Sequence, residues 1–319
     1  MGNYYPLVSV IIPTFNRRKY LQNAVKSVLD QTYANIEIII VDDGSTDGTD
    51  KMVAQFSENI KYIWQPNKGV AFARNEGIKK STGEFVAFLD SDDSWISNKL
   101  EKQMKLFTEN EQTGLVYSDY FREEYGERQP QTTFQWKKAY RGDVLLELLQ
   151  SYFVRTSTVV VKKSLIQRVG LFDQRMSPSE DYDMWLRLAQ VCCFDYVDDP
   201  LVIFRINKEG ISKRDPVYST LTHLAVLKKF KSNNKISKQM NKIITGQIRE
   251  YFYQGAILAH KSLRNRLSID CLIKAYKVGF FLPNPKVLFD SLFHFVYKDK
   301  IDRGKKKLVD YSNIPYLFN

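Results

Sequence analysis

Residues 7–45, LVSVIIPTFNRRKYLQNAVKSVLDQTYANIEIIIVDDGS, contain two short β-branched runs separated by a helical pattern. The runs at 7–13 and 36–41 are apolar throughout, which is typical of parallel strands covered on both faces. Between them, apolar residues recur at helical spacing: Leu21, Ala24, Val25, Val28 and Leu29. The stretch therefore predicts a βαβ unit, the building block of an open α/β sheet.

The same alternation continues outward from this unit. Further apolar runs predict strands at 61–65, 84–93, 114–119, 156–163 and 200–206. Helical patterns are expected near 46–56, 70–80, 144–149 and 180–193. We therefore predict an α/β fold with a mostly parallel open sheet flanked by helices. Asp215-Pro216 is the expected boundary between a domain at 1–215 and a helical extension at 216–319.

Composition excludes several classes of protein. Of the 319 residues, 44% are hydrophobic, which is enough apolar material for a large core. This composition excludes a chain that is intrinsically disordered along its whole length. Three cysteines, Cys192, Cys193 and Cys271, do not form a disulfide framework and favour a reducing cytosol. No uninterrupted apolar stretch reaches about 18 residues, and the first residues lack a signal-peptide pattern. We expect a soluble chain, or one bound to a surface without crossing it.

The net positive charge of the chain comes from its last third. Residues 1–204 contain 24 Lys and Arg against 28 Asp and Glu, whereas residues 205–319 contain 23 against 8. Such a tail is typical either of a solvated cationic helical region or of one attracted to phospholipid or nucleic acid. Composition alone leaves these alternatives open.

Acidic clusters follow two of the expected strands. Asp42-Asp43 ends the second strand, and Asp90-Ser91-Asp92-Asp93 ends the fourth, so the topology predicts that both lie at one edge of the sheet. Carboxylates held close together repel unless a cation offsets them, and oxygen ligands suit Mg²⁺ or Mn²⁺. The alternative is turn and N-cap chemistry, which uses the same residue types and is most plausible at Asp42-Asp43.

Five motifs in order give the chain a specific resemblance. VSVIIPTFNR, VDDGSTDGT, NKGVAFARNEG, GEFVAFLDSDD and LFDQRMSPSEDYDMWLRLA resemble the nucleotide-sugar-binding domain of family 2 glycosyltransferases with the GT-A fold. The resemblance covers roughly residues 5–212. Within the family, the chain resembles bacterial enzymes of surface polysaccharide synthesis.

The resemblance implies a donor site and a metal site. The donor-binding residues that it implies are Pro13, Phe15, Asp43, Arg74, Asp90 and Ser91. It places the metal ion, Mn²⁺ or Mg²⁺, on Asp92, where the ion bridges the donor diphosphate. A cation there stabilises the negative charge that develops on the leaving nucleoside diphosphate. Gly69 and Gly77 flank Arg74, either where the backbone passes close to the ligand or as helix punctuation.

Ser179-Glu180-Asp181 opens the helix expected near 180–193. The resemblance makes Asp181, with Glu180 beside it, the catalytic group: a general base that takes the proton of the acceptor hydroxyl during attack opposite the diphosphate. That geometry inverts the anomeric carbon. The alternative is that both acids merely favour the positive end of the helix dipole.

Two regions depart from the family pattern or vary within it. Family members often carry a histidine metal ligand where this chain has Asn207, which leaves the third protein ligand open. Arg205 is a candidate diphosphate or loop contact. The acceptor side is expected between Asp119 and Thr158, where aromatic residues and arginines suit sugars and phosphates, and Arg155 is the one candidate there.

The C-terminal region predicts contact with a membrane surface. The segments 271–283 and 286–298 are apolar with interspersed lysines, and Gly304-Lys305-Lys306-Lys307 follows them. Such segments suit an interfacial helix on anionic lipid, and the alternatives are a docked helix pair or a homodimer interface. We therefore expect a cytoplasmic protein held peripherally at the inner face of the cell membrane.

The leading hypothesis is an inverting, metal-dependent glycosyltransferase that moves a hexosyl or related sugar. Its donor is a nucleotide-diphosphate sugar, with UDP favoured, and its acceptor a saccharide or lipid-linked saccharide. A sugar nucleotidyltransferase is one alternative, but no Gly-rich phosphate loop with Lys or Arg lies near the N-terminus. A nucleic-acid-binding protein is the other, but the tail has no zinc-finger or RNA-recognition signature, and no nucleic-acid partner is expected.

Overall fold

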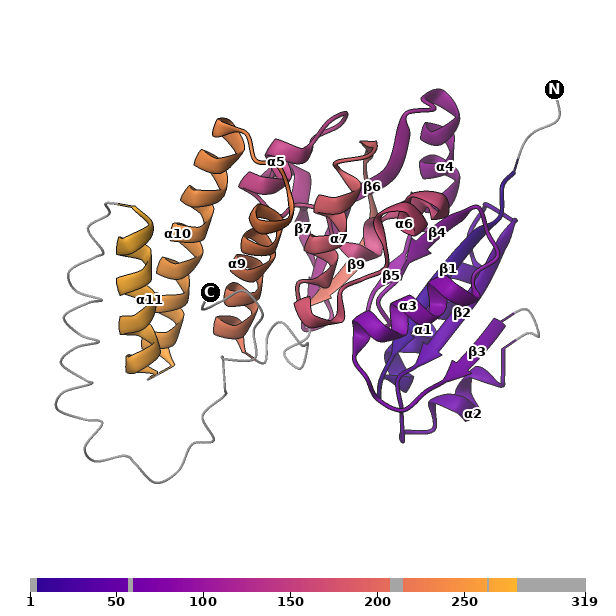
Figure 1. Cartoon of the computed structure of the whole chain (residues 1–319). Helices are drawn as coiled ribbons and strands as arrows, with labels where there is room; N and C mark the ends of the chain where they lie inside the picture. The colour runs from indigo at the N-terminus through magenta and orange to yellow at the C-terminus, as the bar shows by residue number, and fades with distance from the viewer. Residues whose placement is uncertain (1–4, 57–59, 207–214, 263, 280–319) are drawn as a thin grey trace. The chain divides into compact units, whose positions relative to one another are not determined.

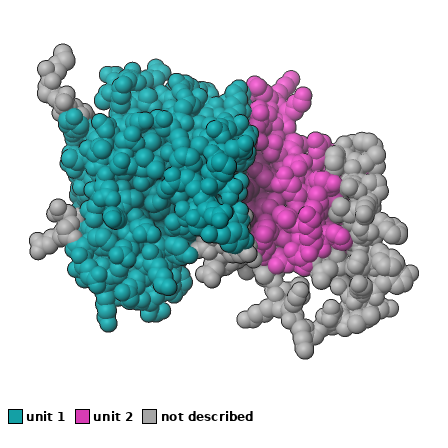
Figure 2. All heavy atoms as spheres, turned by 180° about the vertical axis from the view of Figure 1, so that it is seen from behind, with its two compact units in different colours: residues 1–148, 152–207 teal, residues 149–151, 208–319 magenta. Residues whose placement is uncertain are grey.

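The computed structural model describes residues 5–56, 60–206, 215–262 and 264–279. The chain divides into two compact units, residues 1–148 with 152–207 and residues 149–151 with 208–319 (Figure 2). The predictions for Asn207, for residues 280–283 and 286–298 of the apolar segments, and for Gly304–Lys307 lie outside the described residues. The division falls shortly before Asp215-Pro216, and the functional boundary predicted there stays a prediction.

The first unit is built on one mixed sheet. Its strands are β1 Val8–Thr14, β2 Ile36–Asp42, β3 Ile60–Trp64, β4 Phe85–Phe88, β5 Ser94–Trp95, β6 Thr113–Glu124, β7 Glu127–Thr132, β8 Val160–Lys162 and β9 Cys193–Ile206. In the described part of the chain they are ordered β3-β2-β1-β4-β8-β6-β9-β5, with β7 paired to β6 (Figure 1). Strands β3, β2, β1 and β4 are parallel, as are β6 and β9, whereas β8 and β5 run antiparallel to their neighbours. The predicted α/β sheet is confirmed.

Helices cover both faces of this sheet. The helices of this part of the chain are α1 Arg18–Leu29, α2 Thr49–Val53, α3 Val70–Lys80, α4 Lys99–Glu109, α6 Lys163–Val169 and α7 Glu180–Leu188, with the 3₁₀ turns η1 Thr133–Gln135, η2 Thr156–Thr158 and η3 Gln174–Met176. Helix α5 Leu145–Gln150 has its last two residues in the second unit. On one face, α1 and α4 bury their apolar stripes against Val8, Val10 and Ile12 of β1. On the other face, Ala73 of α3 packs on Ile39 and Val41.

Residues that alternate along one strand therefore serve different layers. Ile11 points to the α3 face, where Gly77 lies against it so closely that an added Cβ would be 2.4 Å from Ile11 Cγ2. Helix α7 packs on the same face, because Phe88 of β4 contacts Phe172 and Trp185. Gly77 is thus a site of close helix–sheet packing, a role that differs from both roles predicted for it.

The register aligns the carboxyl ends of the parallel strands. Thr14 of β1 pairs with Asp42 of β2, and Ile11 pairs with Phe88 of β4. The loops that follow β1, β2 and β4 therefore leave the sheet at the same edge. As predicted, the acidic loops begin at this edge.

Two strands were absent from the prediction, the short β5 and the strand β7 that follows β6. The polar stretch after Asp119 continues β6 to Glu124 and returns as the exposed strand β7. Tyr125 and Gly126 both have positive φ, 54° and 83°, which is the backbone of a two-residue hairpin turn. The hairpin carries part of the segment in which the acceptor side is expected.

The second unit is helical in its described residues. Its helices are α9 Pro216–Asn233, α10 Lys238–Lys261 and α11 Asn265–Val278, and α10 packs against both of the others. Asp215 caps α9 by accepting hydrogen bonds from the backbone N–H groups of Val217 and Tyr218, with Pro216 as the first helical residue. Within the residues that the structure covers, no helix combines the length and apolar character that crossing a bilayer requires.

Candidate active site

The acidic loop after β4 directs its carboxylates to different environments. The side chain of Asp90 is 31% exposed and that of Asp92 14%, whereas Asp93 is buried. Asp93 accepts hydrogen bonds from Ser157 Oγ at 2.5 Å and from the backbone N–H of Arg205 at 2.9 Å. Burial, reinforced by the charges of Asp92 and Asp90, raises the pKa of Asp93 well above its usual range. Asp93 fixes the loop, and Asp90 and Asp92 remain accessible to a ligand.

Arginines neutralise the two accessible carboxylates. Arg17, which follows β1, forms an ion pair with the Asp92 carboxylate. Burial raises the pKa of Asp92 although Arg17 opposes the shift. Arg205 donates to the backbone carbonyl of Asp92 at 2.9 Å and to Glu123 at 2.6 Å, so it holds the loop in place. Arg17 was not among the predicted site residues, although it ends the quoted motif VSVIIPTFNR.

The carboxylates at the end of β2 accept hydrogen bonds from their own loop, from β3 and from the segment that follows β3. Asp42 accepts from the backbone N–H of Ser45 and from Tyr62 Oη, as the turn alternative expects. Asp43 accepts from Gln65 Nε2 at 2.7 Å and from the backbone N–H groups of Lys68 and Gly69 at 2.9 and 2.7 Å.

The acidic clusters at this edge do not form a complete metal site by themselves. Among the described residues, no three His, Cys, Asp or Glu side chains gather closely enough to hold a metal ion by themselves. The physical reason is local satisfaction, because nearby N–H groups already occupy the Asp43 oxygens. Asp43 fixes the loop that leads into α3, which carries Arg74.

Three more of the predicted donor residues flank these loops. Pro13 lies in β1 beside Val41, and Phe15 follows the strand with 43% of its surface exposed. Ser91 is buried in the acidic loop. Phe15 is therefore the most accessible of the three.

Arg74 joins the acidic loop to the helix that bears the catalytic candidates. Its guanidinium donates to Asp90 Oδ1 at 2.7 Å and to Glu180 Oε1 at 2.6 Å, and it lies 5.7 Å from the centre of the Phe172 ring. Burial lowers the pKa of Arg74, but the charges of Asp90 and Glu180 outweigh it and the pKa is raised. Arg74 is therefore a permanent cation enclosed between two acids.

Glu180 and Asp181 differ sharply although they are neighbours. Glu180 is buried, pairs with Arg74 and has a pKa raised by burial. Asp181 is partly exposed and accepts hydrogen bonds from Tyr152 Oη at 2.5 Å, Thr156 Oγ1 at 2.8 Å and the backbone N–H of Tyr182 at 2.7 Å. Tyr152 and Thr156 were missed from the sequence because neither lies in a motif. Of the two acids, only Asp181 is open to a substrate hydroxyl.

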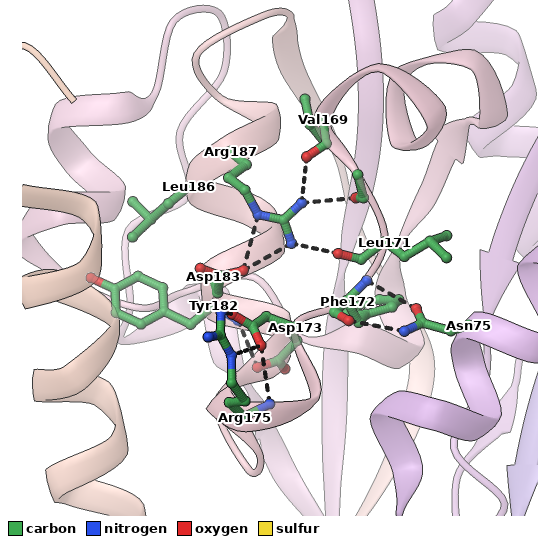
Figure 3. Close-up of polar contacts among 12 residues, drawn as sticks. Asn75, Val169, Leu171, Phe172, Asp173, Arg175, Tyr182, Asp183, Leu186 and Arg187 are labelled. Carbon is green, nitrogen blue, oxygen red and sulfur yellow. Dashed lines mark hydrogen bonds and ion pairs between the residues drawn. The ribbon is translucent and has the colours of Figure 1, made fainter. Parts of the chain in front are cut away.

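Helix α7 is fastened at its far end to the loop that precedes it (Figure 3). Arg187 donates to Asp183 within the helix and to the carbonyls of Val169, Gly170 and Leu171 at 2.8 to 3.0 Å. Phe172 then forms two 2.9 Å hydrogen bonds with Asn75 of α3. Because Asn75 follows Arg74, the two helices that supply Arg74 and Asp181 are fixed to each other through one loop.

These features place an acidic site at the edge of an open α/β sheet, and comparison with known proteins identifies the family. The profile of glycosyl transferase family 2 matches residues 9–170. The chain therefore belongs to glycosyltransferase family 2 and is a glycosyltransferase.

Similar proteins come from several organisms. An uncharacterised glycosyltransferase of Rickettsia typhi is 28% identical over 298 residues, covering 90% of this chain and 88% of that protein. The Escherichia coli enzyme WfgD, UDP-Glc:alpha-D-GlcNAc-diphosphoundecaprenol beta-1,3-glucosyltransferase, is 35% identical over 186 residues, covering 58% and 70%. The solved mannosyltransferase of Pyrobaculum calidifontis, in complex with GDP-Man and Mn²⁺, superposes with a TM-score of 0.63 at 19% identity, covering 93% and 82%. That structure shares the fold.

Proposed function

We propose that this chain is an inverting, metal-dependent glycosyltransferase of surface polysaccharide synthesis. It transfers a hexosyl or related sugar from a nucleoside-diphosphate donor, with UDP favoured, to a saccharide or lipid-linked saccharide acceptor. The printed name of WfgD, with a UDP-sugar donor and a diphosphoundecaprenol-linked acceptor, supports this choice of substrates. Family membership argues against the nucleotidyltransferase alternative.

One observation carries the proposal. Asp90, on the donor side, is linked through Arg74 to Glu180, and the next residue, Asp181, presents a partly exposed carboxylate. A donor held at Asp90 and an acceptor hydroxyl held at Asp181 would thus be positioned by one continuous ion-pair network. Such positioning converts an encounter of two substrates into a reaction within one complex.

The acidic loop suits a divalent ion that arrives with its donor. Mg²⁺ commonly binds through one or two carboxylates together with substrate phosphates, without a complete protein cage. Asp90 and Asp92 are the accessible carboxylates of the loop, and they would hold the ion. When bound, the ion acts as a Lewis acid toward the leaving diphosphate.

The residues of the chain then perform the transfer. Asp181 orients the acceptor hydroxyl, whose oxygen bonds to the anomeric carbon while the bond from that carbon to the diphosphate oxygen breaks. The hydroxyl proton passes to the Asp181 carboxylate, which Tyr152 and Thr156 hold in place. Attack from the face opposite the diphosphate inverts the anomeric configuration.

A screen of nucleotide sugars tests the proposal. The full chain is incubated with UDP-, GDP- and dTDP-sugars, with Mn²⁺ or Mg²⁺, and release of the nucleoside diphosphate is measured with and without saccharide acceptors. We expect release from one donor class, dependent on the metal ion and stimulated by an acceptor. Release of pyrophosphate would contradict the proposal, and so would a failure of the chain to bind any of the nucleotide sugars.

A further inference from the structure

Two cations near Asp181 have no acidic partner among the described residues. Lys137 follows η1, and Arg155 immediately precedes η2. Lys137 Nζ donates to the carbonyl of Tyr152 at 2.5 Å, and Arg155 Nε lies 3.4 Å from Tyr120 Oη. In contrast, Arg74, Arg187 and Arg205 of the same unit all pair with carboxylates. In the described part of the chain, Lys137 and Arg155 thus form no ion pair with a carboxylate.

These two charges act on each other in a partly enclosed setting. Burial and the charge of Arg155 lower the pKa of Lys137 to about 8. The guanidinium of Arg155 lies 5.3 Å from the ring centres of both Tyr152 and Phe204, which screen it from water. Asp181 acts electrostatically on Arg155 but forms no ion pair with it, so the two like charges would attract a further anion.

The segment that carries Lys137 is held in place by the sheet. Tyr117 Oη of β6 donates to the carbonyl of Tyr140 at 2.7 Å and accepts from its backbone N–H at 2.8 Å. The Phe134 ring, three residues before Lys137, packs edge-on against Tyr117. The position of Lys137 beside Tyr152, on whose ring Arg155 stacks, is therefore fixed by the fold.

Tyr152 connects the cation pair to the candidate base. Lys137 binds its carbonyl, Arg155 stacks on its ring, and its hydroxyl donates to Asp181 at 2.5 Å. The charge of Asp181 also acts on Arg155. The donor-side carboxylates Asp90 and Asp92 pair with other arginines, so the cation pair lies with the group that must meet the acceptor.

We propose that Lys137 and Arg155 form a subsite for a phosphate group carried by the acceptor. The guanidinium supplies planar, paired donors that match phosphate oxygens, and the ammonium adds a second point charge. The phosphate would belong to the diphosphate of a lipid-linked saccharide or to a phosphorylated saccharide or polyol. This inference rests on the proposed function, because it assigns the acceptor side of that site.

Calorimetry on the full chain tests the subsite. UDP and Mn²⁺ are held at saturation to occupy the donor site, and n-decyl diphosphate or glycerol 3-phosphate is titrated in separate arms. We expect binding of at least one probe, weakened tenfold or more in Lys137→Gln and in Arg155→Gln. Binding of n-decyl diphosphate alone identifies a lipid-linked source, whereas binding of glycerol 3-phosphate identifies a phosphate ester without lipid.

Matched variants separate specific from general charge effects. Lys138→Gln removes a neighbouring exposed charge, and Arg128→Gln removes a guanidinium that also stacks on an aromatic ring, that of Phe121. Both should bind the probes as the unaltered chain does. If either weakens binding as much as Lys137→Gln does, or if no probe binds, the subsite is refuted.

Two further measurements keep the outcomes distinct. Thermal unfolding checks that Arg155→Gln is folded, and Lys137→Gln, which leaves the stacked rings intact, gives an independent result. UDP binding with Mn²⁺ is measured first. If the chain binds UDP and transfers sugar but binds neither phosphate probe, only the subsite is refuted. If the chain binds no nucleotide, the proposed function is refuted.

Discussion

Asp181 and Glu180 show how much the surroundings of a residue decide its role. The sequence places both acids at the start of one helix, and the resemblance made both catalytic. The fold encloses Glu180 against Arg74 and leaves Asp181 partly exposed between two hydroxyl donors. Those donors, Tyr152 and Thr156, lie 29 and 25 residues away in sequence. No local pattern could have predicted them.

We predict that Asp181→Asn abolishes transfer and spares donor binding. The amide keeps the size of the side chain but cannot accept the proton, and a general base typically contributes about 10²–10⁴-fold to the rate. Acceptor-dependent release of nucleoside diphosphate measures the loss, and calorimetry with UDP and Mn²⁺ measures donor binding. Thr156→Ser, which retains the hydroxyl beside Asp181, serves as the matched control and should stay active. Turnover within tenfold of the unaltered enzyme would remove Asp181 from the role of base.

The cation pair predicts a pH dependence of phosphate binding. The pKa of Lys137 is lowered to about 8 by burial and by Arg155, so Lys137 is a cation below that pH and loses its charge above it. Arg155 stays charged, and the other contact of Lys137 Nζ is the neutral carbonyl of Tyr152. The affinity for glycerol 3-phosphate or n-decyl diphosphate should therefore fall as the pH rises through about 8. A parallel titration of Lys137→Gln should be flat there, and an equal fall in that variant would assign the effect elsewhere.

At the scale of elements, the buried framework could be predicted from sequence and the site only in part. Apolar runs marked the parallel strands because both of their faces are buried. The exposed strand β7 was missed because its residues are polar, although Gly126 carried a turn signal. The strand ends placed Asp43 and Asp90 at one edge of the sheet, but a strand end leaves open which donors each carboxylate meets.

Gly77 gives a test of the close packing between α3 and β1. An alanine Cβ there would be 2.4 Å from Ile11 Cγ2, and overfilling a tight core typically costs about 1–3 kcal/mol. We expect Gly77→Ala to lower the thermal unfolding temperature, even though alanine is the better helix former. Gly246→Ala, inside α10 where nothing lies within 4 Å of the added Cβ, is the matched control and should be neutral or stabilising. Equal stability of the Gly77 variant would show that the helix can move outward freely.

At the scale of the whole molecule, the two parts of the chain differ in the sign of their net charge. The acidic excess lies in residues 1–204, which contain the candidate active site, and the basic excess follows it. Helix α11 also exposes apolar surface, with Ile273 46% exposed beside the exposed Lys277. An apolar side chain next to lysine at a helix surface suits the headgroup region of an anionic bilayer. Peripheral membrane contact remains our expectation for the basic region.

Co-sedimentation of the full chain with vesicles tests that expectation. We predict binding to vesicles that contain phosphatidylglycerol, weak binding to neutral phosphatidylcholine, and release as salt shortens the screening length. The double variant Ile273→Ser with Lys277→Gln should bind several-fold less. Leu29→Ser with Lys26→Gln removes an equally exposed apolar side chain and a charge from α1, and it should bind normally. Equal binding to both vesicle types, or an equal loss in both double variants, would mean that the basic region serves another purpose, for which binding to duplex DNA at low salt is the next measurement.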